Sequence, residues 1–281
     1  MKIANQSAKA GHNDVTAPDE LRSEASAPPA LAVIDGQAVN VSGISDTIDQ
    51  IMQRLTHPDS FLVCTLNLDH LVKRRQDPDF LKAYQRAEIA SADGFPIAAL
   101  ARLDGVVIKR APGSDLVMPL CERASAQKAP VFLIGTTFRA LCLSAKQMVS
   151  SCPGLEICGV FAPPRNFDSQ SKAADDAIEI IRESGARICF VAMGAPRQEI
   201  FAARAIDETR NIAFVAIGGG LDFIAGTQSR CPPLMRRIYL EWAWRLMLNP
   251  RRLGVRYLRC AMLLVALLMR STINRRSLAT G

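Results

Sequence analysis

The chain has 281 residues, of which 49% are hydrophobic and 22% are charged, a composition typical of globular proteins that excludes collagen-like, wholly disordered and small disulfide-stapled classes. The formal charge of +7 is unevenly distributed: residues 230–281 hold eleven Arg, no Lys and one acid, Glu241, and so carry +10, leaving −3 for the remainder. A near-neutral body with a strongly basic C-terminal segment favours a polyanionic partner, either nucleic acid or an anionic membrane surface.

Changes in composition divide the chain into three parts. Residues 1–30 are rich in Ala, Ser, Pro and acidic residues, show no apolar periodicity and contain no apolar signal-peptide core. We therefore expect a disordered leader and a cytoplasmic protein. Residues 31–229 are expected to form the folded core, and residues 230–281 a basic helical appendage.

Short apolar runs alternate with helical patterns through residues 31–229. The expected strands are Phe61–Leu66, Ile89–Ala92, Val131–Gly135, Leu155–Val160, Ile188–Met193 and Ile212–Ile217. The expected helices are Leu68–Arg75, Asp79–Ala87, Phe95–Leu103, Gly113–Ala126 with Ser114 as its N-cap, Phe138–Ser150, Ser171–Ser184 and Gln198–Thr209. Strands separated by helices predict an α/β fold with a parallel sheet covered by helices on both faces.

Four of the loops that follow the expected strands contain polar residues or glycines that are unusual in plain connections. They contain Thr65 and Asn67, Asp93-Gly94, residues 194–199, and Gly218-Gly219-Gly220 with Asp222. Ligands of such sheets bind beyond the carboxyl ends of the strands, so these loops are the expected site.

Two of these loops have competing interpretations. The three glycines let backbone N–H groups approach a phosphate, or they form a plain tight turn; no G-x-G-x-x-G or P-loop motif is present. Asp93 is either a general base or the N-cap of the following helix.

The candidate metal ligands point to ordinary structural roles. Asp77-Pro78-Asp79 matches a D-x-D metal motif, but Pro beside acids is typical of a helix start, which we favour. The three His are scattered, and His70 is expected to have a packing or solvent role. No C-x-x-C pair occurs among the eight Cys, which are expected to be buried apolar residues in a reducing compartment. We predict no essential metal and no cofactor.

The appendage is expected to form two basic helices, Leu234–Leu248 and Arg251–Arg270, split at Asn249-Pro250. Trp and Tyr alternate with Arg, and the apolar run Ala261–Met269 lies between two arginines, a pattern typical of a helix lying in an anionic membrane surface. The longest uncharged run, Cys260–Met269, would be about 15 Å long as a helix, which is too short to span a bilayer. Packing on the core or on a second copy is the alternative, whereas no motif indicates nucleic-acid binding.

Seven short segments, taken together in chain order, resemble the motifs of one protein family. They are Thr65-Leu66-Asn67-Leu68; Asp93-Gly94; Arg110 with Gly113-Ser114-Asp115-Leu116; residues 193–199 (MGAPRQE); residues 218–226 (GGGLDFIAG); Arg230-Cys231-Pro232; and Glu241-Trp242-x-x-Arg245 with residues 249–257 (NPRRLGVRY). Together they resemble the WecG/TagA/CpsF family of bacterial glycosyltransferases over roughly residues 31–258. Leu66, where the family often has Pro, and Cys231, where Ala is common, are departures.

The resemblance implies a Rossmann-like core that transfers a sugar from a UDP-sugar to a polyprenyl-diphosphate-linked saccharide at the cytoplasmic face of the membrane, with inversion and without a D-x-D metal. It makes Asp93 the catalytic base and places Thr65, Asn67 and Gln198 in the substrate pocket. The remaining expected substrate-binding residues are Arg110, Gly218, Gly219, Gly220, Asp222, Arg230, Arg245 and Arg252.

Two other functions compete with this one. The first is a non-catalytic, nucleotide-binding membrane adaptor of a polysaccharide assembly complex; the second is an oxidoreductase on a similar core, disfavoured because the dinucleotide fingerprint is missing. The donor sugar, the acceptor sugar and the formation of a homo-oligomer are not encoded in these motifs.

Overall fold

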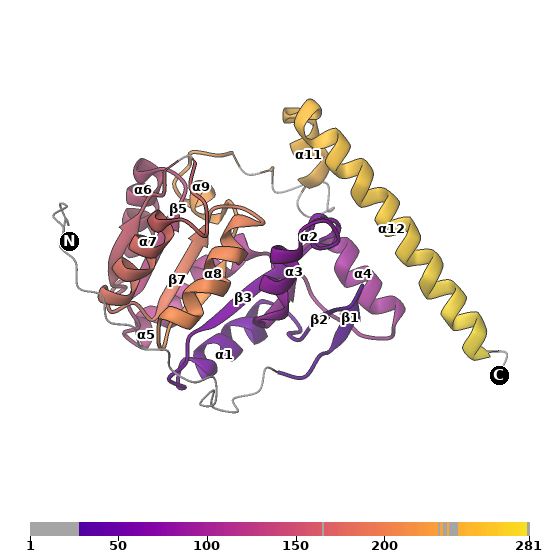
Figure 1. Ribbon diagram of the computed structural model, residues 1–281, viewed down its shortest axis with the longest axis horizontal. Helices are drawn as coiled ribbons and strands as arrows, with labels where there is room; N and C mark the ends of the chain where they lie inside the picture. Colours follow the sequence, from indigo (N-terminus) through magenta and orange to yellow (C-terminus); the bar gives the residue numbers. More distant parts are fainter. Residues whose placement is uncertain (1–27, 165, 230, 233–234, 236–240, 280–281) are drawn as a thin grey trace.

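A six-stranded parallel sheet forms the centre of the molecule (Figure 1). The computed structural model describes residues 28–164, 166–229, 231–232, 235 and 241–279. Across the sheet the strand order is β4-β3-β8-β7-β5-β6. The strands are β3 (Phe61–Leu66), β4 (Ala87–Ala92), β5 (Val131–Gly135), β6 (Ile157–Phe161), β7 (Ile188–Ala192) and β8 (Ala213–Ala216). The predicted α/β fold is confirmed.

Helices cover both faces of this sheet and enclose two apolar cores. Every residue of β3 is buried, and its side chains alternate: Leu62 and Cys64 face one core, Phe61 and Val63 the other. The first core is covered by α2 (Leu68–Arg74), α3 (Pro78–Gln85), α4 (Phe95–Leu103), α7 (Lys172–Glu183) and α8 (Arg197–Glu208). The second is covered by α1 (Ile44–Arg54), α5 (Gly113–Ala126), α6 (Phe138–Ser151) and α9 (Gly220–Ile224). Strands buried on both faces read as continuous apolar runs, which is why the sequence revealed them.

A small antiparallel hairpin precedes the sheet and was not assigned from the sequence. Its strands, β1 (Ala32–Ile34) and β2 (Gln37–Val39), are joined by Asp35-Gly36, with φ of 51° and 76°. Two positive φ values at a two-residue turn match the right-handed twist of a hairpin. Three-residue strands are too short to show a two-residue period, and α1 was missed with them.

The start of α5 corrects one prediction, because Ser114 is not its N-cap. The helix begins at Gly113, its N-cap is Pro112, and no side chain caps it. A Cβ on Gly113 would lie only 2.7 Å from the Cα of Ile217. The absence of a side chain therefore lets the first turn of α5 pack directly against the end of β8.

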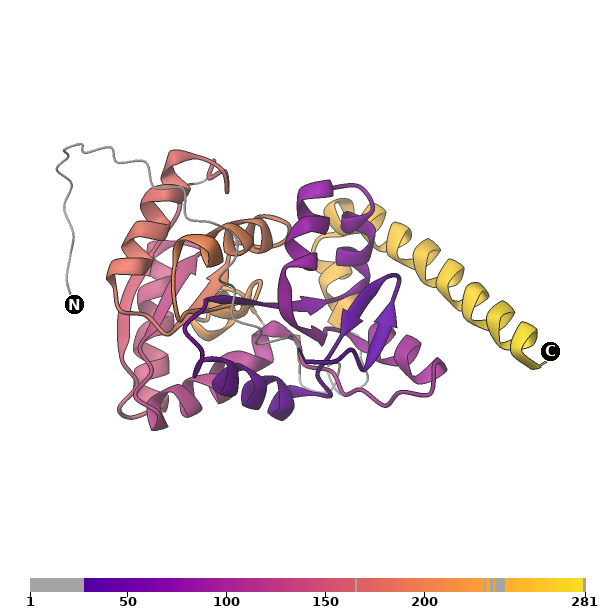
Figure 2. The same ribbon diagram turned by 60° about the horizontal axis from the view of Figure 1, so that its bottom comes forward.

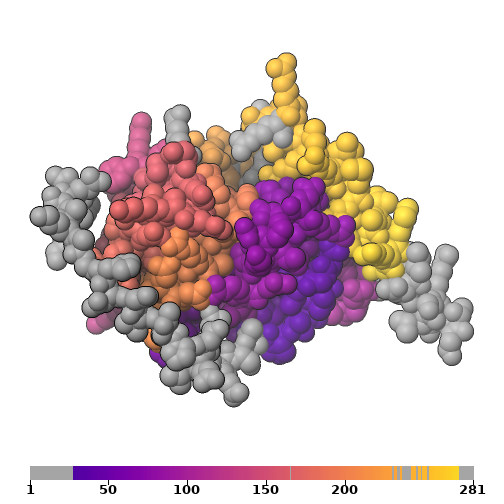
Figure 3. All heavy atoms as spheres, in the orientation of Figure 1, coloured from indigo at the N-terminus to yellow at the C-terminus, as the bar shows by residue number. Residues whose placement is uncertain are grey.

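The appendage continues as α11 (Glu241–Leu248) and α12 (Pro250–Ala279), which confirms the predicted split at Asn249. The second helix is longer than expected, 30 residues, and its far end extends beyond the body (Figures 1 and 2). It lies along α2 and α4 (Figure 3), and Cys260, Leu263 and Leu267 are buried there. The expected helix start at Leu234 lies outside the described residues. Within the described ranges, no helix is long and apolar enough to cross a membrane.

Candidate active site

A cavity of about 800 Å³ lies over the carboxyl ends of β5, β7 and β8, and we call it the strand-end cavity. Residues of the loops after these strands and after β6 form its floor and one side. They are Thr136, Pro163, Pro164, Phe167, Ala192, Met193, Gly194, Arg197, Gly218, Gly219, Asp222, Phe223, Gln228, Ser229 and Cys231. The appendage supplies the opposite wall through Trp244, Asn249, Leu253, Arg256 and Tyr257. This is the edge of the sheet at which the sequence predicted a ligand.

Asp222, one of the predicted residues, is fixed on the cavity floor by two hydroxyl groups. Its Oδ1 accepts hydrogen bonds from Thr136 Oγ1 at 2.6 Å and Thr227 Oγ1 at 3.0 Å. Thr136 follows β5 with a φ of 36°, a left-handed conformation that is uncommon outside Gly. The carboxylate is therefore held in place while one side of it lines the cavity.

Asp93 follows β4, and the side chain of Asn67 holds its carboxylate. Asn67 Nδ2 donates to Asp93 Oδ2 at 3.1 Å, while Asn67 Oδ1 accepts from the backbone N–H of His70 and so caps α2. The backbone N–H of Asp93 donates to Leu66 O at 2.7 Å. The N-cap of α4 is Gly94, with no side-chain capping bond, so the alternative of Asp93 as a helix cap is wrong. The half-buried carboxylate is instead positioned by the loop after the neighbouring strand.

Thr65 lies beneath this pair in a buried polar cluster. Its carbonyl accepts from the Tyr84 hydroxyl at 2.9 Å, and His70 Nδ1 lies 2.9 Å from the same carbonyl and 2.6 Å from Tyr84 Oη. Burial lowers the pKa of His70 to about 4. A neutral, buried imidazole that supports the end of β3 confirms the packing role expected for His70.

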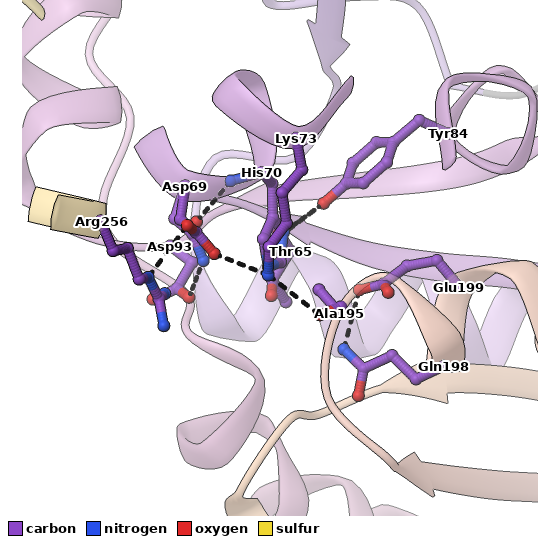
Figure 4. Close-up of polar contacts among 11 residues, drawn as sticks. Thr65, Asp69, His70, Lys73, Tyr84, Asp93, Ala195, Gln198, Glu199 and Arg256 are labelled. Atoms are coloured by element: carbon purple, nitrogen blue, oxygen red, sulfur yellow. Dashed lines mark hydrogen bonds and ion pairs between the residues drawn. The ribbon is translucent and has the colours of Figure 1, made fainter. Parts of the chain in front are cut away.

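One ion-paired group ties the appendage to the sheet edge. Asp69 of α2 accepts from Arg256 Nε of α12 at 2.9 Å and also pairs with Lys73, four residues along, at 2.9 Å. Lys73 Nζ in turn donates to the carbonyl of Ala195, in the loop between β7 and α8, at 2.9 Å (Figure 4). Helix α2 thus joins the cavity wall formed by α12 to a loop of the cavity floor.

Gln198 joins two loops of the cavity floor rather than facing open space. Its side chain is buried, and its Oε1 accepts from the backbone N–H groups of Gly194, at 3.2 Å, and Gly218, at 3.1 Å. Its Nε2 donates to Glu199 Oε1 at 2.7 Å. Because the N–H of Gly218 is already occupied, the glycine-rich loop offers fewer free backbone donors than its sequence suggested.

The other residues predicted to bind substrate are Arg110, Gly220, Arg230, Arg245 and Arg252. The backbone N–H of Ala111 donates to Ala92 O at 2.8 Å, so Arg110 lies at the same end of β4 as Asp93. Gly220 is buried at the start of α9. Arg230 lies outside the described residues, as do the side chains of Arg245, on α11, and Arg252, on α12.

Several cavity residues were not identified from the sequence, or were expected to have a different role. Trp244 and Tyr257 were expected at a membrane interface, yet both line the cavity, and Arg256 lies beside them. Arg197 and Thr136 were not singled out, although Arg197 stands inside the MGAPRQE motif, which was the available signal.

The D-x-D segment forms a helix start, as predicted. Asp77 caps α3 by accepting from the backbone N–H groups of Asp79, at 3.1 Å, and Phe80, at 3.0 Å. In the part of the chain that the structure describes, no three His, Cys, Asp or Glu side chains gather as metal ligands.

Comparison with known proteins agrees with this arrangement. The profile of the glycosyl transferase WecG/TagA/CpsF family matches residues 33–278, which include the sheet, the cavity loops and the appendage. The N-acetylglucosaminyldiphosphoundecaprenol N-acetyl-beta-D-mannosaminyltransferase of Bacillus spizizenii is 27% identical over 191 residues, covering 68% of this chain and 72% of the relative. With most of its length matched, the chain belongs to the WecG/TagA/CpsF family of glycosyltransferases.

Proposed function

We propose that the protein transfers a sugar, with inversion, from a UDP-sugar to a lipid-diphosphate-linked N-acetylglucosamine, and that Asp93 is the general base. One observation carries the proposal: Asn67, which holds Asp93, and Asp69, which holds Arg256 of the cavity wall, stand two residues apart at the start of α2. The carboxylate of Asp93 and the guanidinium of Arg256, which lines the cavity, therefore lie near each other at the start of α2 (Figure 4), an arrangement that suits an acceptor and a donor that meet there.

The reaction needs a single carboxylate. Asp93 takes the proton of the acceptor hydroxyl as that oxygen bonds to the anomeric carbon, and the bond from this carbon to the diphosphate oxygen breaks. UDP leaves with the bonding electron pair. Asn67 donates to Oδ2 of Asp93 and so orients the carboxylate that accepts the proton.

The strand-end cavity is the proposed donor site. Its volume and its aromatic lining, with Phe167, Phe223, Trp244 and Tyr257, suit a nucleoside, and Asp222 offers an acceptor for sugar hydroxyls. Arg256 and Arg197 line the same cavity and would meet the charge that develops on the leaving diphosphate. Arg110, Arg230, Arg245 and Arg252 are proposed to add to this positive field, so we expect no requirement for a metal.

The outer face of α12 is proposed to lie on an anionic membrane surface, because the acceptor is carried by a lipid. Val255, Leu258, Met262, Val265 and Met269 are exposed along this helix at alternating spacings of three and four, which form one stripe. Arg251, Arg259 and Arg270 are exposed on the same helix and would pair with anionic headgroups. We further propose that this surface is the inner face of the cell membrane.

The decisive assay is UDP release from a panel of UDP-sugars with a short-chain prenyl-diphosphate N-acetylglucosamine acceptor. The name of the Bacillus relative makes UDP-N-acetylmannosamine the first donor to test. Asp93→Asn should lower kcat by about two to four orders of magnitude and leave the Kd for UDP, measured by calorimetry, within about threefold. The control is Asp79→Asn, an exposed carboxylate on α3 that should change neither value.

Full turnover by Asp93→Asn would overturn the assignment of the base. UDP binding without acceptor-dependent release from any donor would favour the non-catalytic adaptor. A wild-type protein that does not bind UDP would overturn the donor site.

A further inference from the structure

Glu199 is a buried carboxyl group for which the proposed reaction has no use. It lies on α8, next to Gln198, with none of its surface exposed. Its Oε1 accepts from Gln198 Nε2, whereas its Oε2 is buried with no hydrogen-bond partner among the described residues. A carboxyl group in such surroundings is expensive to bury, so its presence calls for a function.

Three hydrogen bonds fix the orientation of the Gln198 amide, and Glu199 accepts one of them. With Nε2 directed at Glu199, the carbonyl Oε1 is directed at the backbone N–H groups of Gly194 and Gly218 (Figure 4 shows the pair). The opposite orientation would set the NH₂ group against two backbone N–H groups, leaving both N–H groups without an acceptor. Glu199 accepts from the remaining amide group and so stabilises the one orientation in which Gln198 binds both loops.

Both glycines lie in left-handed turns, a conformation that glycine adopts without strain. Gly194 has a φ of 75° and Gly218 a φ of 56°, and each lines the strand-end cavity. Their loops follow β7 and β8, which are neighbours in the sheet, so a single side-chain oxygen between them fixes the distance between the two loops.

We propose that Glu199 is a positioning residue for donor binding, acting through Gln198 to hold the loops after β7 and β8 at the floor of the strand-end cavity. The inference rests on the proposed function in one respect, that the donor binds in this cavity. The role requires an acceptor oxygen at Oε1 and no negative charge.

Glutamine is therefore the conservative replacement. Burial raises the pKa of Glu199 to about 7, so the neutral acid is well populated at neutral pH. Glu199→Gln keeps a carbonyl oxygen for Gln198 and matches the neutral acid in shape. Glu199→Leu fills a similar volume with no acceptor.

The experiment compares these two variants with Glu208→Leu, a control at the exposed end of the same helix. Glu199→Leu should raise the donor KM and the Kd for UDP about tenfold, the loss expected for one buried hydrogen bond, with kcat changed less than threefold. Glu199→Gln should stay within about twofold of wild type in all three values. A merely structural defect would lower the active fraction without raising KM.

A second measurement does not depend on the donor. Amide hydrogen exchange at Gly194 and Gly218, followed by NMR without ligand, should be about tenfold faster in Glu199→Leu and unchanged in Glu199→Gln. Unchanged exchange and unchanged UDP binding in a folded Glu199→Leu would overturn the inference. So would a Glu199→Gln variant as impaired as Glu199→Leu.

The two proposals can fail separately. If the wild type binds no UDP, the donor site is wrong, whereas the exchange rates still decide whether Glu199 holds the loops. If Glu199→Leu does not fold, Glu199→Gln and Glu199→Asp provide the comparison, because Asp carries the same group on a shorter side chain that should not reach Gln198.

Discussion

Arg256 of α12 and Asp69 of α2 form an ion pair of 2.9 Å that fastens the C-terminal appendage to the edge of the sheet. Asp69 is nine-tenths buried and Arg256 about two-fifths exposed, so the pair lies at the margin of the solvent. Through it, a segment remote in sequence becomes a wall of the cavity.

A double-mutant cycle with Asp69→Asn and Arg256→Gln should show a coupling free energy of about 1 kcal/mol in urea unfolding. The coupling should shrink in high salt, because water partly screens the pair. The control cycle is Arg123–Asp49, an ion pair with both side chains about half exposed, whose coupling should be near zero. Equal coupling for both pairs would mean that Asp69 does not specifically anchor α12.

Replacement of Asn67 should separate its role in holding the Asp93 carboxylate from its role in capping α2. Asn67→Asp keeps an oxygen to cap α2 but places a second carboxylate against Asp93, so kcat should fall at least tenfold while stability changes by less than about 1 kcal/mol. The like charge should also raise the pKa of the base, moving the acid limb of the pH–rate profile upward. Asn67→Ala loses the cap as well and should unfold more easily by about 1 kcal/mol. An unshifted acid limb in Asn67→Asp would argue against Asp93 as the base.

His70 should make the protein sensitive to acid. Its pKa is lowered from 6.5 to about 4 in the folded state, so unfolding takes up a proton between these values. Its contribution to stability is complete above pH 6.5 and lost as the pH falls toward 4, by up to about 3 kcal/mol. His70→Asn, which does not titrate, should flatten this part of the stability curve in urea unfolding. The prediction fails if both proteins show the same slope.

Glu199 should make the folding stability depend on pH in the opposite sense, so that stability falls as the pH rises. Its pKa is raised from 4.5 to about 7, mainly by burial, so the folded state holds a proton that the unfolded state releases. Its contribution is complete below pH 4.5 and lost as the pH rises to 7. Lys73 and Asp69 from α2, Cys64 from β3 and Tyr84 from α3 surround it. Stability of Glu199→Gln should therefore decline less between pH 5 and 7 than that of wild type.

Binding to lipid should depend on the exposed stripe of α12. Met262→Glu with Val265→Glu should reduce flotation with vesicles that contain anionic lipid at least tenfold, and wild type should not float with purely zwitterionic vesicles. Leu143→Glu with Val149→Glu, which replaces exposed apolar residues of α6, is the matched control. Unchanged flotation, or a change in oligomeric state instead, would assign the stripe to a second copy of the chain.

The sequence predicted the central strands because each is buried on both faces and reads as an unbroken apolar run. It missed the β1–β2 hairpin, whose three-residue strands are too short to show a period. Asp93 and Asn67 were found through their positions after strands. The orientation of Gln198 was not predictable, because it depends on two glycines that lie 4 and 20 residues away and meet only in the folded sheet.

The appendage shows a different limit of sequence reasoning. Arginines and aromatic residues on one helix look alike whether they face lipid, protein or ligand. Trp244 and Tyr257 line the cavity only because α12 docks on α2 and α4, and no local pattern encodes that docking. Helical spacing shows that stripes exist, while tertiary packing decides what each stripe contacts.

The two-part construction of the cavity has a consequence for how such enzymes diversify. The floor consists of loops rooted in the sheet, where Gly113 and the buried strands tolerate little change. The opposite wall includes Leu253, Arg256 and Tyr257 of α12, a helix that packs mainly on the helices α2 and α4 rather than on the sheet itself. Leu253 and Tyr257 belong to neither apolar core, whereas Leu263, Leu267 and Arg256 keep the helix docked. Substitutions at Leu253 and Tyr257 can therefore reshape the cavity, and with it substrate preference, at little cost in stability.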